Sequence, residues 1–255
     1  TIYKNAQIGI YSACYKLAMI IALVNTAFRQ AAEPFFFSQE KEKNAQRTYA
    51  DIMKYYTISC LFVFLIIALF IQPIANLMIN TKYHEGLSIV PILLFANILL
   101  GIYYNLSVWY KLTQKTLYGM YISIFGALIT IVLNLLLIPL YGYKACAMAT
   151  FICYLVMVCI SYFVGKKHYP IPYNITRILL YSGIAIGLYF VCISVNFSSS
   201  VDLFIRLICI GLFLISVLYI ERPNKFLNSA WIYDRQMTKI KIINQSDFPL
   251  PKYKT

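Results

Sequence analysis

The chain has 255 residues, of which 61% are hydrophobic and only 12% are charged, and its mean hydropathy is +0.70. Its apolar residues fall in continuous blocks of about 20, the length that an α-helix needs to cross a bilayer, so an ordinary soluble domain and a transmembrane β-barrel are both excluded. The net charge is +13, but no nucleic-acid partner is expected, because in a membrane protein the placement of positive residues matters more than their number. The composition predicts an all-α, polytopic transmembrane helix bundle.

Seven hydrophobic segments follow one another along the chain. We place them at residues 8–34, 55–79, 87–110, 117–139, 145–165, 176–195 and 203–220. A polar connection, residues 38–56, separates the first two and has the composition of a short interfacial helix. The other connections are short, which predicts antiparallel neighbours in one bundle. We therefore expect a transmembrane bundle over residues 1–220 and a basic cytoplasmic tail over residues 221–255.

Lys and Arg are unevenly distributed between the two sides that these segments define. Seventeen of the 22 lie on one side, Lys16 lies within a span, and four lie on the other side: Lys4, Lys82, Lys144 and Arg206. Because positive residues concentrate in cytoplasmic loops, the first segment is expected to enter the membrane from outside. The C-terminus is then cytoplasmic, in a multi-pass protein of the cytoplasmic membrane.

The first segment carries the most polar groups of any span. It holds Lys16, Asn25, Arg29 and Glu33 inside or at the edge of its apolar run. Ionisable groups at membrane depth are costly, and they usually face a bundle interior or a water-filled cavity. These four residues are therefore the candidate substrate-binding residues of the chain.

Helical geometry divides these four residues between two faces. At about 100° per residue, Asn25, Arg29 and Glu33 lie close to one stripe, whereas Lys16 lies on another side. For Lys16, lining a cavity and a purely structural role both remain open. For Arg29, an i,i+4 ion pair with Glu33 near the cytoplasmic end is favoured over a place in the cavity.

The later spans carry fewer ionisable groups. Gln72 and Pro73, near the outer end of the second segment, predict a bend. Gly101 in the third segment, and Gly183 and Gly187 at small-xxx-small spacing in the sixth, predict close helix packing. The 23 tyrosines suit a protein with two membrane interfaces to anchor, and no chemistry is assigned to them.

The sequence contains no pattern typical of an enzyme, a cofactor or a metal site. A Gly-rich phosphate loop, a GxSxG elbow, an HExxH motif and usefully spaced paired carboxylates are all absent. The seven cysteines lie in apolar runs without a CxxC pair or a nearby His, so neither a metal site nor a disulfide framework is predicted. We expect a protein that is not an enzyme and that needs no cofactor or metal.

Two stretches of the chain resemble a known superfamily. Residues 9–37, GIYSACYKLAMIIALVNTAFRQAAEPFFF, resemble part of the bacterial polysaccharide-biosynthesis membrane proteins. These are the lipid-linked oligosaccharide flippases of the multidrug/oligosaccharidyl-lipid/polysaccharide (MOP, MATE-like) exporter superfamily. Residues 133–149, LNLLLIPLYGYKACAMA, resemble a second pattern, whose matching positions are Asn134, Ile138, Pro139, Gly142, Ala147 and Ala149. Ala145 and Cys146 depart from that pattern, which has Gly and Ala there, but both remain small.

The resemblance, which covers most of residues 1–195, implies a two-lobed helix bundle that works by alternating access. This chain would supply the second lobe and extra helices, and the first lobe would precede Thr1. The implied function is to flip or export lipid-linked precursors of lipopolysaccharide O-antigen or other polysaccharides across the bacterial cytoplasmic (inner) membrane. The implied partners are an undecaprenyl-pyrophosphate oligosaccharide, the lipid bilayer and other polysaccharide-assembly proteins.

Two alternatives remain open. A drug/cation antiporter of the same superfamily would need an acidic cation site in its cavity, and within the spans of this chain only Glu33 is available for it. A membrane glycosyltransferase or polysaccharide polymerase would need a large outer loop with catalytic residues. The longest outer connection here has only about eight residues.

Overall fold

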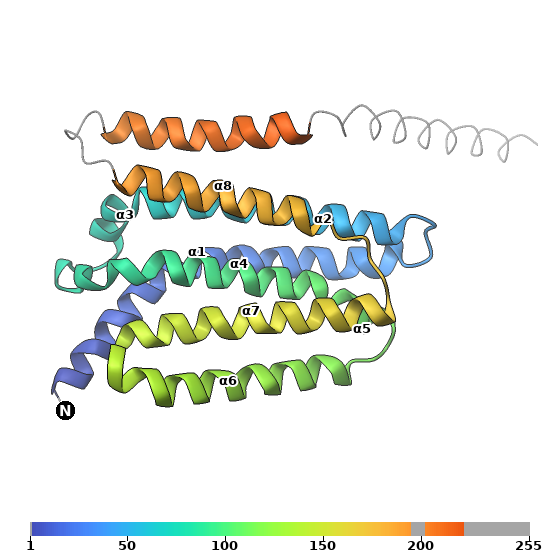
Figure 1. Ribbon diagram of the computed structural model, residues 1–255, viewed down its shortest axis with the longest axis horizontal. Helices are drawn as coiled ribbons and strands as arrows, with labels where there is room; N and C mark the ends of the chain where they lie inside the picture. Colours follow the sequence, from blue (N-terminus) through green and yellow to red (C-terminus); the bar gives the residue numbers. More distant parts are fainter. Residues whose placement is uncertain (1, 195–201, 222–255) are drawn as a thin grey trace, which may run out of the picture. The chain divides into compact units, whose positions relative to one another are not determined.

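The computed structural model of the chain describes residues 2–194 and 202–221, which are almost entirely helical and contain no strand. Its labelled helices are α1 (Ile2–Gln39), α2 (Ala45–Leu69), α3 (Ile71–Met78), the 3-10 helix η1 (Thr81–Ile89), α4 (Val90–Leu106), α5 (Val108–Leu112), α6 (Leu117–Tyr141), α7 (Tyr143–His168) and α8 (Ile175–Ser194). A last helix, unlabelled in Figure 1, covers Asp202–Glu221. The chain divides into two units, Thr1–Ile210 and Gly211–Thr255, and this last helix passes from the first unit into the second.

Among the described residues, seven helical segments are long and apolar enough to cross a membrane. They are Gln7–Gln39, Ala45–Leu69, Thr81–Leu112, Leu117–Tyr141, Tyr143–His168, Ile175–Ser194 and Asp202–Glu221. Each of the seven segments predicted from the sequence overlaps one of these, so the prediction of a polytopic helix bundle is confirmed. Apart from Glu221, the predicted basic tail lies outside the described residues.

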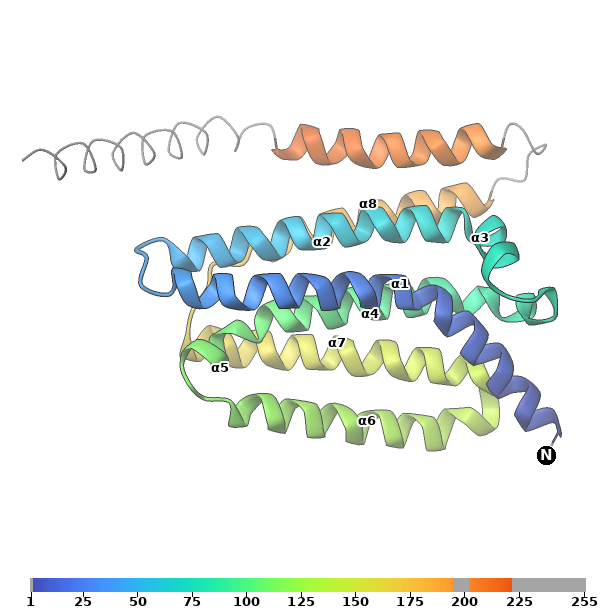
Figure 2. The same cartoon turned by 180° about the vertical axis from the view of Figure 1, so that it is seen from behind.

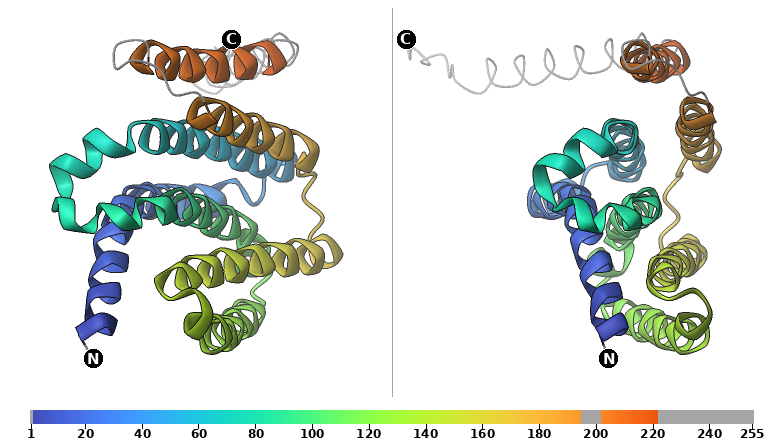
Figure 3. Two further views of the ribbon diagram at one scale, coloured as in Figure 1. Left: turned by 60° about the vertical axis from the view of Figure 1, so that its left-hand side comes forward. Right: turned by 90° about the vertical axis from the view of Figure 1, so that its left-hand side faces the viewer.

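α4 is the central helix of the first unit. It packs against α1, α2 and α7, while α7 also packs on α6, and α2 on α8. Figure 1 shows the resulting order of α8, α2, α4, α7 and α6, with α1 beside α4, and Figure 3 shows α4 enclosed by its neighbours. α4 contains no charged residue, and a helix that is apolar all round is the kind that can be buried in this way.

The helices of the first unit run back and forth, so their connections alternate between two ends (Figures 1 and 2). The α1–α2 and α7–α8 connections share one end with α5. The α6–α7 turn shares the other end with α3 and η1. We call the first of these the inner end and the second the outer end, after the orientation that the Lys and Arg distribution predicts.

The second span begins earlier than the sequence predicted. α2 starts at Ala45 and runs unbroken to Leu69, so residues 38–56 do not form a separate interfacial helix. The reason is packing against α1. The hydroxyl of Tyr49 donates a hydrogen bond of 2.8 Å to the carbonyl of Phe36, and the two rings meet edge to face with their centroids 5.2 Å apart. A helical turn that buries its apolar side against a neighbour is stabilised as part of the longer helix.

The bend predicted at Gln72 and Pro73 is present. α2 ends at Leu69, α3 begins at Ile71, and α3 leaves α2 at an angle (Figure 2). Pro73 has no N–H with which to bond the carbonyl of Leu69, four residues earlier. The helix is therefore interrupted where its ladder of hydrogen bonds lacks a donor.

The prediction of close packing at Gly183 and Gly187 is wrong. A Cβ at either position would meet no atom within 4 Å. The buried residues of α8 include Tyr181 and Ala185, each two residues before one of these glycines. Two residues correspond to about 200° around a helix, so the glycines lie opposite the side that α8 buries.

Candidate functional site

α1 has a buried side and an exposed side. The buried side faces α4, α2 and η1 and contains Ala13, Cys14, Leu17, Ala18, Ile21, Asn25, Ala32 and Phe36. The four candidate residues do not share one environment. Asn25 is buried, Glu33 is half-buried, and Lys16 and Arg29 are exposed.

Asn25 belongs to a hydrogen-bond network that joins α1, α2 and α4. Its Nδ2 donates to the carbonyl of Asn97 at 2.7 Å, and its Oδ1 accepts a hydrogen bond from the Tyr56 hydroxyl. The side chain of Asn97 donates in turn to the carbonyl of Leu93 at 2.9 Å. Both ends of the Asn25 amide are thus occupied, and its exposed fraction is only 2%. Asn25 therefore contributes to helix packing and not to the exposed side of α1.

Gly101 of α4 makes room for this network. A Cβ at this position would collide with the Tyr56 hydroxyl and would lie 2.9 Å from Oδ1 of Asn25. The close packing predicted at Gly101 is therefore present. Sequence reasoning missed Tyr56, which it grouped with the interfacial tyrosines, because no local pattern reveals which helix faces a given tyrosine.

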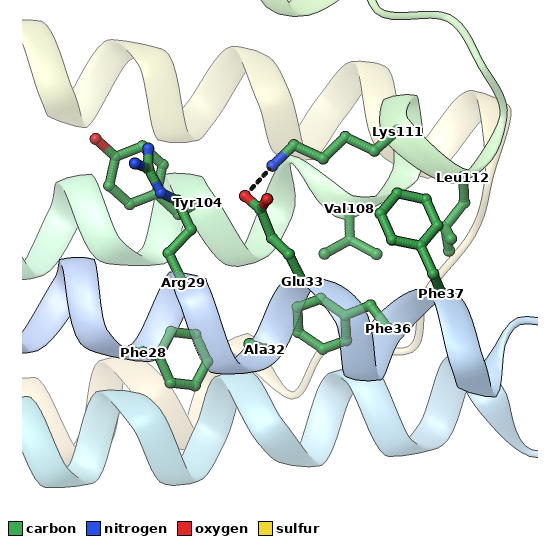
Figure 4. Close-up of a pocket in the computed structure, with 10 residues that line it drawn as sticks. All are labelled: Phe28, Arg29, Ala32, Glu33, Phe36, Phe37, Tyr104, Val108, Lys111 and Leu112. Carbon is green, nitrogen blue, oxygen red and sulfur yellow. Dashed lines mark hydrogen bonds and ion pairs between the residues drawn. The ribbon is translucent and has the colours of Figure 1, made fainter.

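Glu33 pairs with Lys111 of α5 and not with Arg29. The distance between Nζ of Lys111 and Oε1 of Glu33 is 2.6 Å (Figure 4). Arg29 instead extends over Tyr104 of α4, with its Cζ 5.0 Å from the ring centroid. The i,i+4 pair favoured from the sequence is therefore wrong. Spacing along α1 cannot show that α5 presents a cation to Glu33, and an i,i+4 pair contributes only about 0.3–0.5 kcal/mol.

Arg29 and Glu33 line a small pocket between α1 and the α4–α5 segment (Figure 4). Its volume is ≈ 10 Å³, room for about one water molecule. Its lining residues are Phe28, Arg29, Ala32, Glu33, Phe36, Phe37, Tyr104, Val108, Lys111 and Leu112. The pocket has room for no ligand larger than about one water molecule.

Lys16 lies on the exposed side of α1, about 12 Å along the helix axis from Ile8. Within the described part of the chain, no carboxylate lies within ion-pair distance of its ammonium group. An unpaired charge at membrane depth rarely faces lipid, and it normally faces a protein neighbour or water. The face of α1 that carries Lys16 is therefore a candidate for contact with water or with a further protein segment.

α6 provides the contrast. Its exposed residues are almost all apolar, among them Leu128, Leu135 and Leu136, and it contains no charged residue. A surface of this composition suits contact with lipid tails. The exposed residues of α1, in contrast, include Lys16, Arg29 and Gln30 among apolar side chains such as Leu23.

An open groove of ≈ 1000 Å³ lies at the outer end, between the first turns of α1 and the α6–α7 turn. Gly142 forms that turn with a φ of 57°, a conformation that strains residues with a side chain. The polar residues that line the groove are Gln7, Tyr11, Glu85, Tyr141, Tyr143 and Lys144. Sequence reasoning did not find this groove, because its walls come from three separate stretches of the chain.

Comparison with protein-family models matches residues 3–136, just over half of the chain, to the family described as MatE. The chain belongs to the MatE family. Among curated proteins and among solved structures, no match was found. MatE proteins are membrane transporters and not enzymes, so this MatE chain is a multi-pass membrane transporter of the MOP superfamily. The resemblance of residues 9–37 is thereby confirmed at the level of the superfamily.

The MatE match covers the helices that carry the candidate site. It runs from the first turns of α1 into α6, and so contains Lys16, the Asn25 network and the Glu33–Lys111 pair. α7, α8 and the last helix follow the matched region. The exposed polar side of α1 therefore lies in the part of the chain by which it belongs to this family.

Proposed function

We propose that this MatE chain forms one lobe of a flippase that moves lipid-linked oligosaccharides of the undecaprenyl-pyrophosphate type across the bacterial cytoplasmic membrane by alternating access. The observation that carries the proposal is Lys16, a cation on the exposed side of a membrane-spanning helix that has no carboxylate partner among the described residues. A pyrophosphate linker is dianionic, and a positive side chain offsets the cost of bringing that charge into a medium of low dielectric constant.

Arg29 supports the proposal by its position on the same helix. It lies thirteen residues beyond Lys16, which is about 20 Å along the helix axis. The pyrophosphate of a crossing substrate would therefore meet Arg29 towards the inner end and Lys16 towards the outer end. The two cations lie on different sides of α1, so they act at successive positions and do not clamp one ligand together.

The outer groove supports the proposal that the substrate carries a sugar-bearing headgroup. Its volume of ≈ 1000 Å³ is at the upper end of the usual range for ligand pockets, about 300–1,000 Å³. Gln7, Tyr11 and Glu85 offer an amide, a phenol and a carboxylate to sugar hydroxyl groups. The groove lies at the end where an outward-moving headgroup would leave the lobe.

The ion pair of Glu33 argues against the drug/cation antiporter. That function needs a carboxylate that is free to bind a cation, and Glu33 is already paired with Lys111 at 2.6 Å. The exposed side of α1 thus presents positive charge, and the carboxylate on this helix is neutralised. This arrangement favours an anionic substrate.

The test uses the full-length protein in proteoliposomes that contain a fluorescently labelled lipid-linked oligosaccharide. We expect the label to become accessible on the far side of the membrane. Lys16→Ala should slow the rate of flipping about tenfold, because a hydrogen bond to a charged group contributes about 1.5–3 kcal/mol. Lys16→Arg keeps the charge and should retain most of the rate. The matched control is Leu23→Ala, because Leu23 is exposed on the same side of α1.

Two results would contradict the proposal. If Lys16→Ala flips the labelled lipid as fast as the unchanged protein, Lys16 has no part in the mechanism. If the unchanged protein leaves the lipid where it was but exchanges protons or sodium for organic cations, the antiporter replaces the flippase.

The proposed cytoplasmic location of the C-terminus, where polysaccharide-assembly proteins would dock, is tested separately. A single cysteine introduced into residues 222–255 should react with an impermeant maleimide only from the cytoplasmic side.

A further inference from the structure

Arg206 is a cation at the end of the bundle where cations are few. It is one of the four Lys and Arg residues on the predicted outer side. It lies at the start of the last helix, within the first unit, and the exposed fraction of its side chain is 24%. Nη2 of Arg206 lies 2.6 Å from Oδ2 of Asp202, one turn earlier, so its charge is neutralised within its own helix.

The same guanidinium also contacts the end of α2. Nη1 of Arg206 donates a hydrogen bond to the backbone carbonyl of Leu69, the last residue of α2. Its Cζ lies 5.9 Å from the centroid of the Phe70 ring. The planar fork of arginine allows one side chain to reach a carboxylate and a carbonyl at once, which the single ammonium of lysine does less well.

The carbonyl of Leu69 needs this donor because of Pro73. In an unbroken α-helix it would accept a hydrogen bond from the N–H of residue 73, and proline has none. A backbone carbonyl that lacks a donor within the bilayer is destabilising, so neighbouring helices normally supply one. Arg206 is 137 residues away in sequence from Leu69, and it is such a neighbour.

We propose that Arg206 supplies the hydrogen bond that Pro73 removes, and that this contact fastens the start of the last helix to the break between α2 and α3. Asp202 holds the guanidinium in place. The contact makes the outer end of the last helix part of the same packed bundle as α2. It also explains why an arginine stands on the side of the membrane where positive residues are scarce.

A double-mutant cycle in the full-length protein tests the proposal. Arg206→Ala should lower the midpoint of thermal unfolding by about 2–4 °C, the shift that corresponds to roughly 1 kcal/mol in a chain of this size. Pro73→Ala restores the missing N–H, so Arg206→Ala should lower the midpoint far less when Pro73→Ala is also present. Lys144→Ala, which removes another outer-end cation, is the matched control and should cause no shift. An equal loss with and without Pro73 would overturn the proposal.

A second measurement does not require purified, folded variants. Cys192 in α8 and Cys209 near the start of the last helix are both buried free thiols, so a cross-link between them reports on how the start of the last helix is docked. With the other five cysteines replaced by Ala, oxidative cross-linking in membranes should fall severalfold on Arg206→Ala and less on Arg206→Lys. Adding Pro73→Ala to Arg206→Ala should restore the cross-linking. Undiminished cross-linking in Arg206→Ala would overturn the proposal even if thermal unfolding could not be measured.

Discussion

Lys111 and Glu33 are 78 residues apart in the sequence, yet their side chains form an ion pair of 2.6 Å that joins α5 to α1 at the inner end of the bundle (Figure 4). The pair takes the place of an i,i+4 pair within α1. It leaves Arg29 to lie over the Tyr104 ring, and it neutralises the carboxylate that a cation transporter would require.

Breaking this pair should destabilise the protein only modestly. The exposed fractions of the Lys111 and Glu33 side chains are 28% and 40%, so water screens the attraction, and we expect Glu33→Gln to cost about 0.5 kcal/mol. Exchanging the two residues, Glu33→Lys with Lys111→Glu, should recover most of that loss. Thermal unfolding in detergent measures both effects. Glu40→Gln, which removes an exposed carboxylate just after α1, is the control and should cost less.

Removing one hydroxyl from the buried network should cost more than breaking the ion pair. Tyr56→Phe leaves Oδ1 of Asn25 without its donor in a buried site, which we expect to lower the free energy of unfolding by about 1–3 kcal/mol. Tyr55→Phe makes the same chemical change at the neighbouring residue, whose side chain is exposed, and should have little effect. Equal unfolding midpoints for the two variants would mean that the network contributes nothing to stability.

Two glycines should respond to alanine in opposite directions. Gly101→Ala introduces a methyl group where the Tyr56 hydroxyl lies, and overpacking of this kind costs about 1–3 kcal/mol. Gly183→Ala adds a methyl group into open space on α8, where the higher helix propensity of alanine should stabilise by up to about 1 kcal/mol. Unfolding midpoints of the two variants provide the comparison. A loss at Gly183 as large as that at Gly101 would show that the exposed side of α8 is covered in the membrane.

Arg29 should matter more for transport than for stability. Its contact with the Tyr104 ring is at an exposed site, where a cation–π contact contributes about 0.5–1 kcal/mol. We therefore expect Arg29→Ala to shift unfolding slightly but to slow the flipping of labelled lipid severalfold, while Arg29→Lys keeps most of the rate. Gln30→Ala, at the adjacent exposed position, should flip the lipid normally. Normal flipping by Arg29→Ala would remove this residue from the substrate path.

The number of membrane-spanning segments and their approximate positions were accessible from the sequence. The seven spans, the bend at Pro73 and the division of α1 into two faces all follow from local rules, namely the length of apolar runs, the missing N–H of proline and the 100° rotation per residue. The polar character of α1 was also visible, because a charge within an apolar run is unusual wherever its partners lie. These features depend on neighbours in the chain and on the solvent.

The tertiary structure alone decided which of those polar groups have a hydrogen-bond or ion-pair partner. Asn25 is hydrogen-bonded to Tyr56 and Asn97, and Glu33 forms an ion pair with Lys111. Lys16 remains exposed. Hydrogen bonds and ion pairs between helices depend on which faces meet. In membranes those faces are selected by close packing and by satisfied polar groups. Burying an apolar helix surface against another helix gains little, because lipid tails are as apolar as that surface. The sequence by itself therefore determined a bundle of membrane helices with a polar first helix, and packing determined that, among the described residues of that helix, Lys16 and Arg29 stay exposed on different faces.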